Sequence, residues 1–372
     1  MLGIEFPIVA FSHCRDVVAA VSKAGGFGIL GAVAHSPEML DTELTWIEEQ
    51  AGGKPFGVDL LLPPKYIGAA AGGIDAAQVR ALLPPEHQEF LDDLLRRYGI
   101  PVPSDEERLP PGAGLSVSPK GYEPLLDVAF AHPITMLASA LGPPPLDVVE
   151  RAHANNVLVA ALAGTTRHAI RHKEAGVDLI VAQGTEAGGH TGEVATMVLV
   201  PEVVDAVAPV PVLAAGGIAR GRQVAAALAL GAEGVWCGSV WLTTEEAETP
   251  PVVKEKFLAA SSSDTVRSRS LTGKPARMLR TAWTDEWDRP DTPDPLGMPL
   301  QTALIGDPQY RIHQASNNPD AKARELATYF VGQVVGSLAT VRPAKAVVLE
   351  MVEEFIEAVQ SLDRLLEGEP VG

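Results

Sequence analysis

The 372-residue sequence predicts an α/β fold: a closed (β/α)8 TIM barrel with an insertion after the third strand and a smaller C-terminal helical lobe. Two observations favour it. Eight apolar runs of strand length alternate with segments of helical spacing. The last three runs each end in a glycine-bearing loop, as on the rim where such barrels carry their sites. An open doubly wound sheet is the alternative architecture.

The expected strands are short apolar segments bounded by turn residues. They are residues 7–11, 27–30, 56–61, 134–138, 157–162, 177–181, 210–215 and 234–237. Helices are expected between them. They include residues 16–24, a helix that begins at Pro37 after the N-cap residue Ser36, and residues 146–155, 166–175 and 221–230.

Residues 63–121 interrupt this alternation and form the expected insertion. Within it, residues 86–98 have the spacing of an amphipathic helix. Its apolar face would carry Phe90, Leu91, Leu94 and Leu95. Lys65 and Tyr66 open the insertion close to the rim, where a positive charge could receive an anionic substrate or a coenzyme A phosphate. A solvated surface is the other interpretation of this pair.

The pattern changes again after the eighth strand. We expect residues 1–245 to form the barrel and residues 246–372 to form an irregular and helical lobe that packs on it. In this second part, residues 321–338 and 344–366 have helical spacing of apolar residues.

Composition and charge exclude several classes of function. The formal net charge of −18 would repel nucleic-acid phosphates at long range, so no nucleic-acid partner is expected. No apolar segment is long enough to span a bilayer, and no secretory signal precedes the first strand. The two cysteines do not make a disulfide framework. We therefore expect a cytoplasmic protein that acts on a small molecule, with a homo-oligomer left open.

Glycine loops after the seventh and eighth expected strands predict a phosphate site. Gly216-Gly217 and Gly238-Ser239 allow backbone N–H groups to approach phosphate oxygens, and Ser239 can donate its hydroxyl. A following helix N-terminus would add favourable partial charge. The alternative is that these glycines serve only tight turns.

A histidine lies in the loop after the sixth expected strand. His190 is surrounded by small residues that leave room for a ligand, so we expect it to act in catalysis or substrate contact. A structural histidine is the alternative. No metal site is predicted: His168 and His172 are four residues apart, but they lie on the expected helix 166–175, on a face taken to be solvated.

Several segments together resemble the nitronate monooxygenase family, formerly called 2-nitropropane dioxygenases. The most specific is the histidine loop Ala182-Gln183-Gly184-Thr185-Glu186-Ala187-Gly188-Gly189-His190, and the likeness extends over most of the chain outside residues 63–121. The other matching segments are residues 27–31, 56–58, 214–218 and 272–277, with a weaker match at 332–336.

The resemblance implies an FMN-binding barrel and assigns roles to residues. It places the phosphate on Gly216, Gly217, Gly238 and Ser239, and His190 beside flavin N5. Gln183 and Gly189 would lie near the flavin ring or ribityl chain. So would residues that close strands one, three and four, among them Phe11 and Asp59. The implied reaction converts alkyl nitronates with O2 into carbonyl compounds and nitrite.

The sequence departs from the family pattern at three places. Thr191 stands where arginine is usual, residues 10–13 replace a Gln-Ala-Pro-Met type segment, and Asp59 replaces asparagine. We expect His13 to contact flavin or substrate, and the alternative is a loop histidine satisfied by backbone groups. We expect Thr191 to contact substrate. An alternative function is an NAD(P)H-dependent flavin reductase acting on enoyl or acyl thioesters, or on quinones. A third is a flavin- or phosphate-binding protein without turnover.

Overall fold

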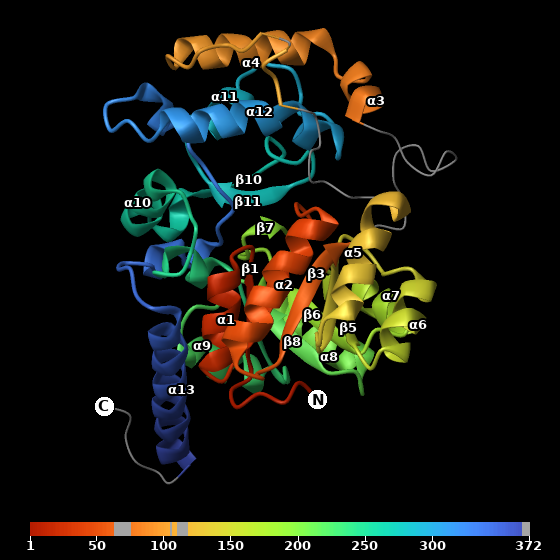
Figure 1. Ribbon diagram of the computed structural model, residues 1–372. Helices are drawn as coiled ribbons and strands as arrows, with labels where there is room; N and C mark the ends of the chain where they lie inside the picture. The colour runs from red at the N-terminus through yellow and green to blue at the C-terminus, as the bar shows by residue number, and fades with distance from the viewer. Residues whose placement is uncertain (63–75, 105, 110–117, 367–372) are drawn as a thin grey trace.

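The computed structural model describes residues 1–62, 76–104, 106–109 and 118–366. Lys65 and Tyr66 lie outside these residues, so the two interpretations of this pair stay predictions. Figure 1 shows two layers: a barrel with its surrounding helices below, and a layer of helices and short strands above.

The barrel is closed, which confirms the predicted fold and makes the open doubly wound sheet wrong. Its strands follow the order β1-β2-β3-β4-β5-β6-β8-β9, all parallel, and β9 pairs back with β1 at Ala10 and Cys237. The strands are β1 (Ile8–Ser12), β2 (Phe27–Gly31), β3 (Phe56–Leu61), β4 (Met136–Ala140), β5 (Leu158–Ala163), β6 (Leu179–Gln183), β8 (Val212–Ala215) and β9 (Gly234–Cys237). Each predicted strand is found, with ends that differ by a few residues.

Helices cover the outside of the barrel. They are α1 (Arg15–Lys23), α2 (Pro37–Ala51), α5 (Pro119–Ala131), α6 (Leu146–Ala154), α7 (Thr166–Glu174), α8 (Thr196–Val207) and α9 (Gly221–Ala229). Local signals define their ends: the Ser36 hydroxyl accepts the Met39 N–H at 3.2 Å at the start of α2, and Gly52 closes that helix with φ 61°. Apolar side chains fill both the barrel interior and the space between strands and helices.

The upper layer combines the insertion with part of the C-terminal region. It contains α3 (Ala76–Ala81), α4 (Pro85–Arg97), α10 (Pro251–Ala259), η3 (Ser262–Asp264), β10 (Thr265–Ser268), β11 (Ala276–Leu279), α11 (Ala282–Trp287) and α12 (Leu300–Ala315). In Figure 1, α4 lies above α12 and α11, and β10 and β11 lie between them and the barrel. A short strand from the barrel rim, β7 (Gly189–His190), completes an antiparallel sheet of order β10-β11-β7.

The predicted helix of the insertion is found as α4. It buries Leu91, Leu94 and Leu95, and the ring of Phe90 meets Trp287 edge-on at 4.8 Å. An ion pair joins Arg97 to Glu286 of α11, with its shortest contact at 2.6 Å. The insertion is thereby attached to the C-terminal part of the chain.

Of the two C-terminal segments that were expected to be helical, one is found as a helix and the other is not. Residues 344–366 form α13 (Ala344–Leu366), which packs on α9 and α1 beside the barrel. Residues 321–338 do not form an α-helix: they contain two 3-10 turns, η4 (Lys322–Glu325) and η5 (Gln333–Ser337). The backbone N–H groups that a helix would use are instead bonded to other segments, such as Gln333 N–H to the Glu186 carbonyl at 2.9 Å. Across the described chain, no helix is long and apolar enough to cross a membrane.

Candidate functional site

A cavity of about 980 Å³ opens at the carboxyl ends of the barrel strands. Residues from the upper layer, such as Lys274 and Phe330, complete its wall. Apart from Lys65 and Tyr66, which lie outside the described residues, every residue that the sequence singled out for cofactor or substrate lines this one cavity. These residues are Phe11, His13, Asp59, Gln183, Gly189, His190, Thr191, Gly216, Gly217, Gly238 and Ser239.

One end of the cavity carries unused backbone donors. Gly216 and Gly217 adopt φ values of 100° and 70°, which a glycine tolerates at no steric cost. Within the described residues, the N–H groups of Gly217, Gly238 and Ser239 have no acceptor. The Ser239 oxygen accepts the Gly332 N–H at 2.8 Å and donates to no described group, so its proton is free. This end can bind an anion such as a phosphate.

The helix N-terminus expected to assist is occupied by a protein carboxylate. Gly221, the first residue of α9, donates its N–H to Glu354 at 2.8 Å. The donors at this end of the cavity therefore come from the glycine loops and from the start of the 3-10 helix η2 (Ser239–Thr243).

His190 is placed by strand pairing rather than by a free loop. It lies in β7, opposite Ala276 of β11. Its Nε2 lies 2.8 Å from the Thr272 hydroxyl. Burial and, second, the positive charge of Lys274 lower the pKa of His190 to about 4. The imidazole is therefore neutral at neutral pH in the unliganded protein.

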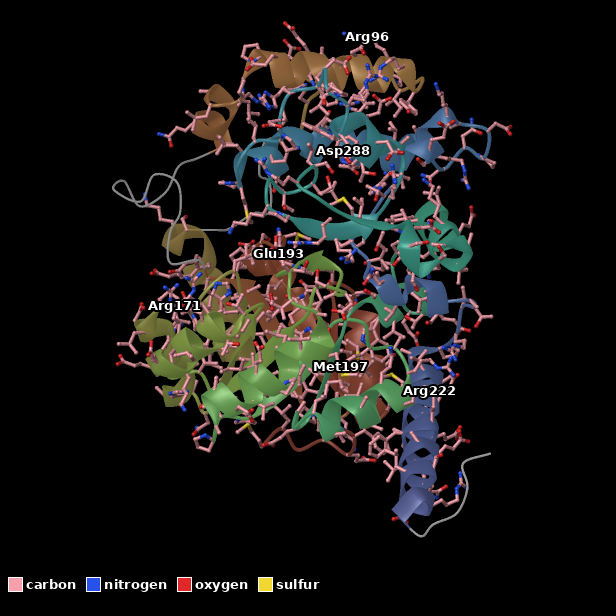
Figure 2. The ribbon with its side chains drawn as sticks, turned by 180° about the vertical axis from the view of Figure 1, so that it is seen from behind. Arg96, Arg171, Glu193, Met197, Arg222 and Asp288 are labelled. Carbon is pink, nitrogen blue, oxygen red and sulfur yellow. The ribbon has the colours of Figure 1, made fainter. Side chains whose placement is uncertain are left out.

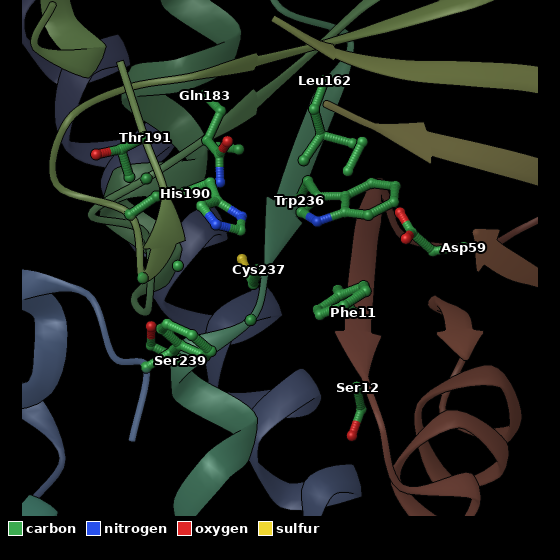
Figure 3. A pocket seen from close by; sticks show the side chains of 18 of the residues that line it. Phe11, Ser12, Asp59, Leu162, Gln183, His190, Thr191, Trp236, Cys237 and Ser239 are labelled. Atoms are coloured by element: carbon green, nitrogen blue, oxygen red, sulfur yellow. The ribbon is translucent and has the colours of Figure 1, made fainter. Parts of the chain in front are cut away.

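Apolar side chains and an amide form the middle of the cavity. Phe11 and Trp236 are stacked with ring centroids 6.2 Å apart, and Leu162 lies next to Trp236 in Figure 3. The side chain of Gln183, at the end of β6, extends toward His190 in the same view. None of the described residues bonds to the Gln183 amide. This region offers an apolar ligand a hydrophobic wall and one polar partner.

His13 lies at the rim end of β1. Its Nδ1–H donates to the Gly31 carbonyl at 2.8 Å, and its ring meets Phe11 edge-on. Burial lowers the pKa of His13, and the Gly31 carbonyl opposes this effect only in part. A Cβ on Gly31 would lie 2.7 Å from the His13 ring and 2.8 Å from Phe11. Gly31 therefore gives both rings the space that they occupy.

Asp59 is a buried carboxyl group at the end of β3. It is 6% exposed, and in Figure 3 it lies beside Trp236 and Phe11. No hydrogen bond joins its carboxyl to any described residue. Burial raises the pKa of Asp59 to about 8, so the group is mostly protonated at neutral pH. A ligand would meet a neutral hydrogen-bond donor here rather than an anion.

Thr191 follows the histidine and is held by a neighbouring arginine. Its carbonyl accepts a hydrogen bond from Arg267 at 3.2 Å. Its hydroxyl oxygen is buried and has no partner among the described residues. In Figure 3 this hydroxyl points away from Phe11 and Trp236, toward the other side of the loop.

The structure also brings residues to the cavity that the sequence did not single out. Among them are Trp236, Lys274, His313, Tyr329 and Phe330, which line the cavity, and Thr272, which reaches it through His190. Trp236 could have been found from the sequence, since it lies on the expected strand 234–237, directly before the loop of Gly238. The others come from the upper layer, which no strand–helix alternation could place on the rim.

The two histidines of α7 do not both lie on a solvated face. His168 is exposed, but His172 is 1% exposed and bonds to the Leu162 carbonyl at 3.0 Å. The expectation for His172 is wrong because this residue, in the last turn of α7, lies on the side of the helix that faces the barrel.

One group of possible metal ligands is found among the described residues. It joins Cys14, Asp16 and Glu248. The Cys14 thiol donates to the Glu246 carbonyl at 2.9 Å, and burial raises the pKa of this thiol. A protonated, hydrogen-bonded thiol is a poor metal ligand, so we assign no metal to this group.

Comparison with known proteins identifies relatives over nearly the whole chain. The family model described as nitronate monooxygenase matches residues 2–354. A Mycobacterium tuberculosis protein provisionally named a monooxygenase is 78% identical over 367 residues, covering 99% of this chain and 98% of the relative. A Staphylococcus aureus protein provisionally named a nitronate monooxygenase is 29% identical, covering 97% of each chain.

Solved structures agree with this result. The nitroalkane oxidase of Streptomyces ansochromogenes has a TM-score of 0.80 and 28% identity, covering 97% of this chain and 98% of that one. FabK of Thermotoga maritima has a TM-score of 0.69 and 27% identity, covering 98% and 97%. An enoyl reductase domain from Bacillus amyloliquefaciens shares the fold at 12% identity, with a TM-score of 0.64.

Proposed function

The chain belongs to the nitronate monooxygenase family of flavin-dependent oxidoreductases, and from this premise we propose that it is an FMN-dependent nitronate monooxygenase. It would oxidise alkyl nitronates to carbonyl compounds and nitrite, with O2 as the electron acceptor. The observation that carries the proposal is the composition of the cavity: it combines free anion donors, an apolar wall and a neutral histidine.

The residues present fit a flavin mononucleotide. The unused N–H groups of Gly217, Gly238 and Ser239, with the Ser239 hydroxyl, would hold the phosphate. Phe11 and Trp236 would form an apolar wall beside the ring system, and the Gln183 amide would bond to its polar edge. Gly189 has a φ of 75°, and a Cβ on it would meet no described atom within 4 Å, so its backbone leaves room for the cofactor.

Each part of the site then has a task. The bound flavin supplies the oxidation of the substrate. His190, neutral and in contact with the cavity, orients an anionic nitronate or accepts the α-proton of a neutral nitroalkane. Lys274, whose charge acts on His190, attracts the anion. Phe330, 6.4 Å from the His190 ring, helps to exclude water.

A second candidate function is an NAD(P)H-dependent flavin reductase that acts on enoyl or acyl thioesters. Two observations favour it. Thr191 replaces the arginine usual in the family, and the cavity also reaches Gly142 and His168, which leaves space for a longer substrate. An enoyl reductase domain from Bacillus amyloliquefaciens has the same fold, so the fold alone does not separate the two functions.

An anaerobic visible spectrum of the purified flavoprotein tests the proposal. We expect an alkyl nitronate to change the flavin bands, NADH to leave them unchanged, and nitrite to form once O2 is admitted. His190→Asn should lower turnover of a neutral nitroalkane by about 10²- to 10⁴-fold and that of the preformed nitronate by less. Prompt reduction by NADH with an inert nitronate would overturn the proposal in favour of the reductase.

A further inference from the structure

The hydroxyl of Thr272 is the protein partner of His190. It lies 2.8 Å from Nε2, and the threonine is 8% exposed. Nδ1 of the same ring has no partner among the residues that the structure describes. The two nitrogens of His190 therefore differ: one is held by the protein, and the other is left for whatever enters the cavity.

The other bonds of Thr272 decide which atom donates. The hydroxyl donates to the Lys274 carbonyl at 3.1 Å and accepts the Lys274 N–H at 3.3 Å. A hydroxyl has one proton and two lone pairs. When the hydroxyl donates its proton to the Lys274 carbonyl, its second lone pair can accept a hydrogen bond from an N–H of His190. If the hydroxyl donated to His190 instead, the Lys274 carbonyl would lose its hydrogen bond, and one lone pair of the hydroxyl oxygen would accept no hydrogen bond.

The turn that carries Thr272 is itself fixed. Gly273 has a φ of 81°, and a Cβ there would overlap the carbonyl of Leu296. Its N–H donates to the Arg269 carbonyl at 2.8 Å, and the Arg269 side chain reaches back to the Gly273 carbonyl at 3.2 Å. A turn held on both sides keeps the hydroxyl in one orientation. It can therefore select one form of the histidine.

We propose that Thr272 is a positioning residue that holds His190 in the Nε2–H tautomer, so that Nδ1 presents a free lone pair to the cavity. In this form His190 accepts a hydrogen bond or a proton at Nδ1 and cannot donate there. What this state does in catalysis rests on the proposed function. An unprotonated Nδ1 can accept the α-proton of a neutral nitroalkane, but it cannot donate a hydrogen bond to a nitronate anion. The tautomer itself does not depend on the substrate.

Long-range ¹H–¹⁵N correlation spectra of ¹⁵N-histidine-labelled full-length protein, with and without FMN, test the inference at neutral pH. His190→Asn identifies the signals. We expect a protonated Nε2 and an unprotonated Nδ1 in the wild type, a mixture of tautomers in Thr272→Val, and the wild-type pattern in Thr272→Ser. Turnover of a neutral nitroalkane should fall roughly 10-fold in kcat in Thr272→Val, with little change in KM, and return in Thr272→Ser.

Thr284→Val is the matched control. Thr284 is also buried, and its hydroxyl also donates to a carbonyl, that of Thr281, and accepts a backbone N–H. This variant should keep the His190 tautomer and kcat. A wild-type signal with the proton on Nδ1, or an unchanged tautomer in Thr272→Val, would overturn the inference whatever the substrate is. The expected tautomer without any nitroalkane or nitronate turnover would instead refute the proposed function.

Discussion

Glu354 of α13 accepts the backbone N–H of Gly221, the first residue of α9, at 2.8 Å. The same carboxylate bonds to Arg220 at 2.9 and 3.0 Å, and Arg222 lies beside α13 in Figure 2. The helices approach so closely here that a Cβ on Gly221 would overlap the Met351 carbonyl. One carboxylate therefore both caps α9 and attaches the C-terminal helix to the barrel.

Replacing this carboxylate should destabilise the fold. We expect Glu354→Ala to lower the free energy of unfolding at pH 7 by about 2 kcal/mol, because a buried charged cap is lost. Burial alone would raise the pKa of Glu354, but Arg220, Arg222 and the Gly221 N–H outweigh it and hold the pKa below its usual value. The contribution is thus present above the ordinary glutamate pKa of 4.5 and is lost as the pH falls through the lowered value.

Urea unfolding from pH 7 to acid measures this prediction. Glu357→Ala, on an exposed position of the same helix, is the control and should change stability little. A Glu354→Ala variant as stable as the control at pH 7 would contradict the capping role.

Ser239→Ala should weaken FMN binding through the phosphate alone. The free hydroxyl proton of Ser239 is expected to bond to the phosphate, and losing a hydrogen bond to a charged group reduces FMN affinity about 10-fold. Riboflavin, which lacks the phosphate, should bind wild type and variant equally. Fluorescence titration of the apoprotein gives both affinities. Equal losses for the two ligands would show that the hydroxyl only supports Gly332.

Asp59→Asn should change how stability depends on pH. In the unliganded wild type the pKa of Asp59 is raised from 3.8 to about 8, so the unfolded chain releases this proton first as the pH rises. Stability is therefore lost progressively from about pH 4 to about pH 8. The variant cannot ionise and should be more stable than the wild type at pH 8, with an advantage that fades toward pH 4.

Thermal or urea unfolding of the apoprotein across this range measures the difference. Asp147→Asn, at an exposed position of α6, supplies the control. A difference between Asp59→Asn and wild type that is constant with pH would mean that Asp59 is ionised in the folded protein.

Gly31→Ala should displace two side chains that line the cavity. The new Cβ would push on the rings of Phe11 and His13, which line the cavity, so flavin affinity should fall at least 10-fold. Gly306→Ala is the matched control, since nothing lies within 4 Å of its Cβ position on α12 and alanine favours helix. Titration of both apoproteins with FMN decides the point. Unchanged affinity in Gly31→Ala would remove Phe11 and His13 from the flavin site.

The barrel could be predicted because its signals are local. Each strand is a short apolar run, and parallel strands of a barrel end on one rim, so the order of the runs places Gln183, Gly216 and Gly238 together. The same reasoning brings His13 and Asp59 to that rim. Neither step needs knowledge of contacts that are distant in the chain.

The upper layer could not be predicted in this way. Strand β7 has two residues, and its pairing of His190 with Ala276 joins positions far apart in the sequence. Nothing near Thr272 reveals that its hydroxyl meets His190. Residues 321–338 have apolar residues at helical spacing, but they form an irregular segment. Its backbone N–H groups bond to Ser239 and Glu186. Tertiary contacts there override the local pattern.

The bonds from Gly332 to Ser239 and from Gln333 to Glu186 have a practical consequence for anyone who engineers this protein. Cutting the chain after the last barrel strand would keep all eight strands of the barrel. The rim would nevertheless lose the segment that joins the glycine loop to the histidine loop, and both would be free to move apart. Transplanting the activity therefore requires the whole chain through α13, and a fusion partner is better attached at either terminus than inserted between barrel and upper layer.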